Sequence, residues 1–209
     1  MSTARDEVLA RIRSALAPSG PGSGPRPGPE PLPDPPLDPR PAPTGAALLD
    51  LFVDRLVDYR AEVVRTHAAG LPAALVRVLA GAVPVVPTGL PPAWGVAGVT
   101  DHAGLTADDL DRQPCVVTAC AVAIAETGTI VLDHGTDQGR RALTLVPDRH
   151  VCVVRADQVV PDVPQALARL DAARPLTFVS GPSATSDIEL QRVEGVHGPR
   201  TLQVVLVEG

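Results

Sequence analysis

The sequence has no long hydrophobic run. No stretch approaches the roughly 18 uninterrupted apolar residues that suggest a membrane-spanning helix. The N-terminal segment MSTARDEVLARIRSALA carries charges along its length and lacks the apolar core of a secretory signal. We therefore expect a cytoplasmic protein that is not secreted and has no membrane span.

Cysteine is also scarce, since Cys115, Cys120 and Cys152 are the three in the chain. Their spacing lacks the CxxC repeats of zinc and iron–sulfur sites. No metal-ligand spacing is found among four scattered histidines: His67, His102, His134 and His150. We expect that this chain binds no metal and no cofactor of its own. Because each cysteine lies among small or β-branched apolar residues, we expect buried, reduced thiols.

Lysine is absent, and all 18 basic residues are arginines. The formal net charge is −6, the pI is about 5.3, and no basic cluster is longer than Arg140-Arg141. A nucleic-acid-binding surface needs a broad basic patch. The sequence therefore argues against nucleic acid as a partner.

Three regions differ in composition along the 209 residues. Residues 1–17 have the pattern of an amphipathic helix, with acidic residues in the first turn. Residues 18–43 contain half of the 24 prolines and no periodic apolar pattern, which is typical of an extended linker. Residues 44–209 are expected to form one compact domain, because 44% of the chain is hydrophobic.

Helical and strand-like patterns alternate within residues 44–209. Helices are predicted at 46–59, 72–79, 106–110, 164–170 and 187–193. Strands are predicted at 61–66, 83–86, 116–118, 129–132, 150–154, 176–179 and 202–207. Because the strands are almost continuously apolar and alternate with helices, the fold class is predicted to be α/β, with a mostly parallel sheet covered by helices on both faces.

In such a sheet, binding groups gather in the loops after the carboxyl ends of the strands. The first loop of interest is the turn at Glu126, Thr127 and Gly128, between apolar segments. Burial there would raise the pKa of Glu126 and suit it to acid, base or nucleophile chemistry. The alternative is structural: the carboxylate accepts backbone N–H groups in a tight turn that requires Gly128.

A second loop, residues 133–141, ends in Arg140 and Arg141. An arginine fork matches the geometry of a carboxylate or phosphate, so either side chain is a candidate for holding an anionic ligand. Adjacent residues point in different directions, so at most one should reach such a site. A surface ion pair is the ordinary alternative for each arginine.

A third loop follows the strand at 176–179 and leads into the predicted last helix. Its candidate anion-binding residues are Ser180, Gly181, Ser183 and Thr185. The alternative is a helix start, because Ser186-x-x-Glu189 fits a capping box. His197, in the turn that follows, is a candidate proton carrier or a structural histidine.

Three segments of this chain resemble the LUD-domain family of lactate-utilization proteins. They are AETGTIVL at 125–132, GRRALTLVPDRHVCVV at 139–154 and SGPSATSDIELQRVEGVHGP at 180–199. The resemblance extends over about residues 46–207. It implies a fold similar to that of the NagB, ribose-5-phosphate isomerase and CoA-transferase superfamily. It also implies a role in oxidising L-lactate to pyruvate with two iron–sulfur partner proteins, which would carry the redox centres.

The chemical task of this chain stays open between several alternatives. One is a subunit that binds a small carboxylate or supports assembly of the oxidising complex. A second is a stand-alone enzyme of the CoA-transferase kind, because Glu126-x-Gly128 is similar to the turn that presents the nucleophile there, or of the sugar-phosphate-isomerase kind. A third is a regulatory sensor of an organic acid. Fold alone does not choose between them.

Overall fold

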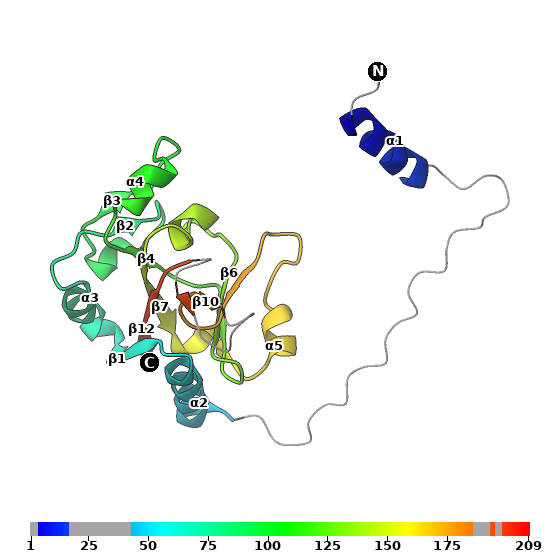
Figure 1. The fold of residues 1–209 in the computed structure, drawn as a ribbon. Coiled ribbons are helices and arrows are strands. Elements are labelled where there is room, and N and C mark those ends of the chain that lie inside the picture. The colour runs from blue at the N-terminus through cyan, green and yellow to red at the C-terminus, as the bar shows by residue number, and fades with distance from the viewer. Residues whose placement is uncertain (1–3, 17–42, 186–192, 195–197) are drawn as a thin grey trace. The chain divides into compact units, whose positions relative to one another are not determined.

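The computed structural model describes residues 4–16, 43–185, 193–194 and 198–209 (Figure 1). The chain divides into two units, Met1–Pro41 and Ala42–Gly209. Helix α1 (Ala4–Leu16) belongs to the first unit and matches the predicted N-terminal helix. Most of the predicted linker lies outside the described residues. Of the helices described, none has the length and apolar character needed to cross a membrane.

The second unit contains a six-stranded parallel sheet with the order β1-β12-β7-β4-β2-β3. Its strands are β1 (Glu62–His67), β2 (Val85–Val86), β3 (Val99–Thr100), β4 (Val116–Thr118), β7 (Arg149–Arg155) and β12 (Thr201–Glu208). This sheet confirms the predicted α/β class, because its strands are joined by crossovers that carry helices.

Side chains alternate between the two faces of this sheet, as the period of a strand requires. On one face, Val151 and Val153 of β7 share a core with helix α3 (Leu71–Leu79). On the other face, Cys152 and Val154 share a core with helix α2 (Gly45–Asp58), which contributes the fully buried Phe52 and Leu56. In Figure 1, α3 and α2 lie at different sides of β7 and β12.

Four further strands form a second sheet, which the sequence analysis did not separate from the first. Its order is β8-β5-β6-β9, and its strands are β5 (Val122–Ile124), β6 (Thr129–Leu132), β8 (Val159–Val160) and β9 (Thr177–Val179). The pairs β5–β6 and β6–β9 are antiparallel. A turn as short as that between β5 and β6 is too short for a parallel crossover, so these two strands form a hairpin.

The remaining elements are short. They are α4 (Ala107–Asp111), α5 (Val163–Leu167), β10 (Ala184–Thr185), β11 (Val193–Glu194) and the 3₁₀ turns η1 (Ala68–Gly70), η2 (Pro92–Trp94), η3 (Arg141–Thr144) and η4 (Ala156–Gln158). The helix predicted at 187–193 lies outside the described residues except for Val193. That residue lies in β11, paired with Thr185 of β10, so the helix prediction is wrong there.

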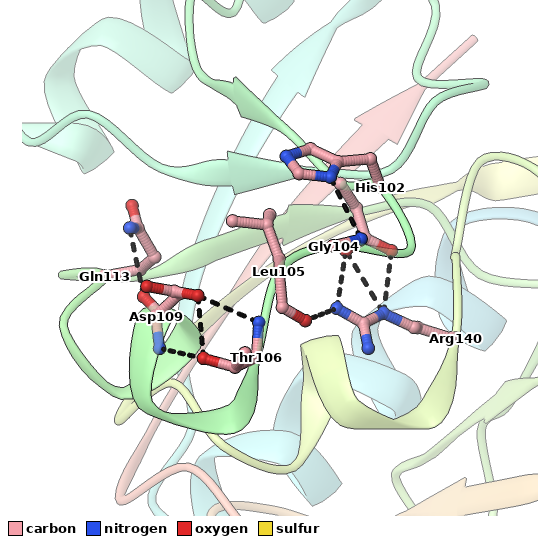
Figure 2. Close-up of polar contacts among 8 residues, drawn as sticks. His102, Gly104, Leu105, Thr106, Asp109, Gln113 and Arg140 are labelled. Atoms are coloured by element: carbon pink, nitrogen blue, oxygen red, sulfur yellow. Dashed lines mark hydrogen bonds and ion pairs between the residues drawn. The ribbon is translucent and has the colours of Figure 1, made fainter.

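Helix α4 begins at a capping box formed by Thr106 and Asp109. The Thr106 Oγ1 accepts a hydrogen bond from the Asp109 backbone N–H at 3.2 Å, and Asp109 Oδ2 accepts one from the Thr106 backbone N–H at 2.9 Å (Figure 2). We expect Thr106→Ala to lower the free energy of unfolding by about 1 kcal/mol, measured by urea denaturation. Thr106→Ser keeps the hydroxyl and should leave stability close to wild type; equal losses in both variants would contradict the capping role.

Candidate functional site

A pocket of about 240 Å³ lies between the two sheets of the second unit. Its lining residues are Arg141, Thr144, His150, Thr177, Phe178, Val179, Ser180, Gly181, Pro182, Ser183, Gly198, Pro199 and Leu202. His150 and Leu202 lie at the amino ends of β7 and β12, where they are register partners. The expectation that the site would follow the carboxyl ends of the parallel sheet is therefore wrong for these strands. The pocket lies at this end of the sheet because β9, an edge strand of the second sheet, leads at its carboxyl end directly into the pocket.

Arg141 lies at the rim of this pocket, at the start of η3. Its Nη1 donates a hydrogen bond to Thr144 Oγ1 at 3.2 Å, and it forms no ion pair with any residue that the structure describes. Although the side chain is exposed, surrounding protein atoms desolvate the guanidinium and lower its pKa. Arg141 is thus a cation beside a cavity without an acidic neighbour among the described residues.

Arg140 is oriented differently and does not line the pocket. Its guanidinium binds both carboxylate oxygens of Asp101, at 2.9 to 3.1 Å. Arg140 Nη2 also donates to the Leu105 carbonyl at 2.7 Å (Figure 2). The structure therefore brings one of the two candidate arginines to the pocket and places the other in an ion pair.

The loop after β9 supplies the opposite wall, with Ser180, Gly181 and Ser183 all lining the pocket. Ser180 Oγ lies 2.7 Å from Thr129 Oγ1, and the Ser183 backbone N–H donates to the Pro199 carbonyl at 2.8 Å. Gly181 has a φ of +80°, and an added Cβ would lie 2.6 Å from Tyr59 Cβ. The loop thus depends on glycine to pass close to the end of α2.

Two other candidates of this region are not placed at the pocket. Thr185 is described only as part of strand β10, and His197 lies outside the described residues, as does the predicted capping box at 186–189.

The residues of the turn at Glu126 do not themselves line the pocket. Glu126 is exposed, and its carboxylate forms no hydrogen bond or ion pair with the residues described. Neither expected role, a buried reactive carboxylate or an acceptor of backbone N–H groups, is seen. The apolar neighbours of Glu126 are buried in strands, whereas its own side chain points to solvent. Thr127 Oγ1 lies 2.8 Å from Thr129 Oγ1, so hydroxyl contacts run from this turn to Ser180.

His150 lines the base of the pocket and was not singled out from the sequence. It is 2% exposed, and its Nε2 lies 2.8 Å from Thr118 Oγ1 of the neighbouring strand β4. Thr118 Oγ1 in turn lies 3.9 Å from Cys152 Sγ. A signal was present in the sequence: a histidine in the otherwise apolar strand HVCVV needs a polar partner when buried.

All three cysteines are buried and free of disulfides, which confirms the prediction of buried thiols. A hydrogen bond with Cys152 and burial raise the pKa of Cys120. The hydrogen bond with Cys120, together with the neighbouring His150 and Thr118, lowers the pKa of Cys152. In the geometry, Cys120 Sγ donates to Gln158 Oε1 at 3.6 Å, and Cys152 Sγ donates to the Ala119 carbonyl at 3.6 Å. Within the described part of the chain, no group of three or more histidine, cysteine, aspartate or glutamate residues is arranged to hold a metal ion.

Similarity to known proteins agrees with the resemblance found in the sequence. Residues 97–207 match the family described as the LUD domain. Lactate utilization protein C of Deinococcus radiodurans is 52% identical over 170 residues, which are 78% of this chain and 80% of that protein. Lactate utilization protein C of Bacillus licheniformis is 34% identical over 100 residues, 44% of this chain and 41% of that protein.

A solved structure is similar as well. The crystal structure of a DUF162 family protein from Deinococcus radiodurans superposes with a TM-score of 0.69 at 45% identity, covering 80% of this chain and 100% of that chain. The fold, the family match and the identity over most of the chain agree, and the chain therefore belongs to the LUD-domain family.

Proposed function

We propose that this protein serves lactate utilization as a subunit that binds a small carboxylic acid in the pocket beside Arg141. The name of the Deinococcus radiodurans relative, at 52% identity, supports the process. The observation that carries the binding role is Arg141, a partly desolvated cation at the rim of a cavity, without an acidic partner among the described residues. A guanidinium matches a carboxylate in charge and in shape.

The other lining groups suit an acid of a few carbon atoms. Hydroxyls of Thr144, Ser180 and Ser183 line the pocket together with apolar Val179 and Leu202. A cavity of about 240 Å³ is small, and one arginine balances one carboxylate. These features support a short monocarboxylic acid as the ligand.

The redox steps are assigned, in this proposal, to iron–sulfur partner proteins in the cytoplasm. The three buried cysteines of this chain lie in two places, Cys115 beside Arg149 and Cys120 beside Cys152, which offers no set of thiolates for a cluster. Copurification of this chain with proteins that show iron–sulfur absorbance would support the assignment.

No observation favours the CoA-transferase-like or isomerase-like alternative, since exposed Glu126 does not line the pocket. An organic-acid sensor would use the same pocket. A reconstituted lactate-oxidising complex distinguishes the subunit role from the sensor role. If this subunit handles the acid, Arg141→Ala lowers the turnover of the complex at subsaturating lactate. If it is a sensor, the turnover does not change.

We expect Arg141→Ala to weaken binding of L-lactate about tenfold in isothermal titration calorimetry. A charge-assisted hydrogen bond is worth about 1.5–3 kcal/mol, and the exposed position of Arg141 at the rim favours the lower end. Arg140→Ala is the matched control, because that guanidinium is bound to Asp101. Affinity that is equal in wild type and Arg141→Ala, or that falls only in Arg140→Ala, would contradict the proposal.

A further inference from the structure

The base of the pocket holds a polar group with unused hydrogen-bonding capacity. His150 lines the pocket although it is 98% buried, being 2% exposed. Its Nε2 is occupied by Thr118 Oγ1 at 2.8 Å, whereas its Nδ1 forms no hydrogen bond with the residues that the structure describes. Because His150 lines the pocket, Nδ1 is the ring nitrogen that remains for a ligand to bind.

The neighbours of His150 determine which ring nitrogen carries the proton. Thr118 has one hydroxyl proton and two hydrogen-bonding neighbours, His150 Nε2 at 2.8 Å and Cys152 Sγ at 3.9 Å. Cys152 is the group that takes this proton, because Thr118 Oγ1 is the donor in its contact with Cys152 Sγ. The Thr118 oxygen is then left to accept a proton from His150 Nε2.

In this arrangement a neutral His150 carries its proton on Nε2, and Nδ1 is an acceptor. The same direction holds when Cys152 is a thiol, since its S–H then donates to the Ala119 carbonyl, 3.6 Å away, and the sulfur still accepts from Thr118. The three side chains thus form a directed chain of hydrogen bonds from the pocket into the core.

We infer that His150 is the specificity-determining residue of the Arg141 pocket, that its Nδ1 accepts a hydrogen bond from a ligand hydroxyl, and that the pocket therefore prefers a short hydroxy acid to the matching oxo acid. Thr118 and Cys152 act as positioning residues through the ring of His150. This inference rests on the proposed function, because it assumes that Arg141 holds the carboxylate.

The preference follows from what each acid offers to Nδ1. A hydroxyl donates a hydrogen bond to the ring nitrogen. A ketone oxygen is only an acceptor, so it forms no hydrogen bond with Nδ1, which is also an acceptor. An acid without an oxygen substituent leaves Nδ1 without a hydrogen-bond partner in the ligand. Sites built around a hydrogen bond reject ligands that lack the matching group strongly. We expect at least about a tenfold difference in affinity, as for one lost hydrogen bond to a buried group.

The test measures binding of L-lactate, pyruvate and propionate to the full chain by isothermal titration calorimetry. These acids have three carbons and one carboxylate and differ only at the second carbon. Wild type should bind L-lactate at least about tenfold more tightly than either of the others. His150→Gln should remove the preference, because the glutamine amide replaces Nε2 as the donor to Thr118 and supplies nothing at Nδ1.

A second variant tests the chain of hydrogen bonds without touching the pocket. Cys152→Ala removes the acceptor of the Thr118 proton, so Thr118 donates to His150 Nε2 and Nδ1 becomes an N–H donor. The ratio of L-lactate to pyruvate affinity should then fall by about tenfold. Cys115→Ala is the matched control, since this buried thiol contacts Arg149 and not His150, and its ratio should stay at the wild-type value.

The outcomes separate the inference from the proposed function. If the three acids bind wild type equally and all depend on Arg141, the inference is wrong and the carboxylate site stands. If none of them binds, both are wrong. An affinity ratio that does not change in Cys152→Ala, or changes equally in Cys115→Ala, also overturns the inference. Should His150→Gln fail to fold, the wild-type selectivity and the two cysteine variants still decide.

Discussion

Replacing Phe52 by alanine is expected to lower the free energy of unfolding by about 3–5 kcal/mol, a large share of the stability of an ordinary domain. Phe52 is one of two phenylalanines in the chain, and it is fully buried between α2 and the six-stranded sheet. Few other large side chains are available to fill the space that it leaves, because aromatic residues make up 2% of the sequence. Urea denaturation followed by circular dichroism measures the loss.

The second phenylalanine provides the control. Phe178 is 48% exposed on β9 and lines the pocket. We expect Phe178→Ala to change the free energy of unfolding by no more than about 0.5 kcal/mol. Similar losses in the two variants would show that α2 does not hold the core as described.

Replacing Gly128 by alanine is expected to cost about 3 kcal/mol of folding free energy, through two separate effects. Gly128 has a φ of +58°, a left-handed conformation that costs other residues about 1–2 kcal/mol. An added Cβ would also lie 2.8 Å from Arg55 Cβ and 2.9 Å from the Arg55 carbonyl carbon, so the last turn of α2 must move.

Gly45 isolates the first effect, because its φ is +57° and an added Cβ would meet nothing within 4 Å. Gly45→Ala should therefore lose only the backbone contribution, about 1–2 kcal/mol, in the same thermal or urea unfolding experiment. Equal losses at both glycines would rule out the contact with α2. A larger loss of folding free energy at Gly128 would show that the Glu-x-Gly turn needs glycine for its packing against α2. In that case Glu126→Gln should leave stability and ligand binding unchanged.

Long periodic segments were predicted correctly from the sequence. Helix α2 and strands β7 and β12 follow from apolar residues at the spacing of a helix or in continuous runs. The short strands β3, β5 and β8 were not predicted. Strands β2, β4 and β9 are as short and were predicted, so length alone is not the reason; the place of β3, β5 and β8 is set by tertiary pairing. The second sheet was missed because two of its four strands, β5 and β8, were not predicted.

Parts of the candidate site could also be anticipated. The loop at Ser180 and Ser183 and the pair Arg140-Arg141 were each proposed as anion-binding candidates, and the structure brings Arg141 to that loop. Which arginine reaches the pocket depends on Asp101, a residue far away in sequence, and no local pattern shows that ion pair. His150 was missed because its importance lies in its neighbours on β4, which become close only when the sheet forms.

The position of β12 in the sheet has a consequence for synthesis on the ribosome. This strand comes last among the described elements, yet it pairs on one side with β1 and on the other with β7. The hydrogen bond from Gln203 of β12 to Glu62 of β1 joins residues that are 141 positions apart, so it forms only after β12 has been synthesised. Until β12 has left the ribosome, β1 has no strand partner, β7 has an open edge, and the apolar faces that α2 and α3 cover are incomplete. The nascent chain therefore cannot close its core stepwise, and the time for which these strand edges stay open to aggregation or chaperones is set by translation of the intervening residues.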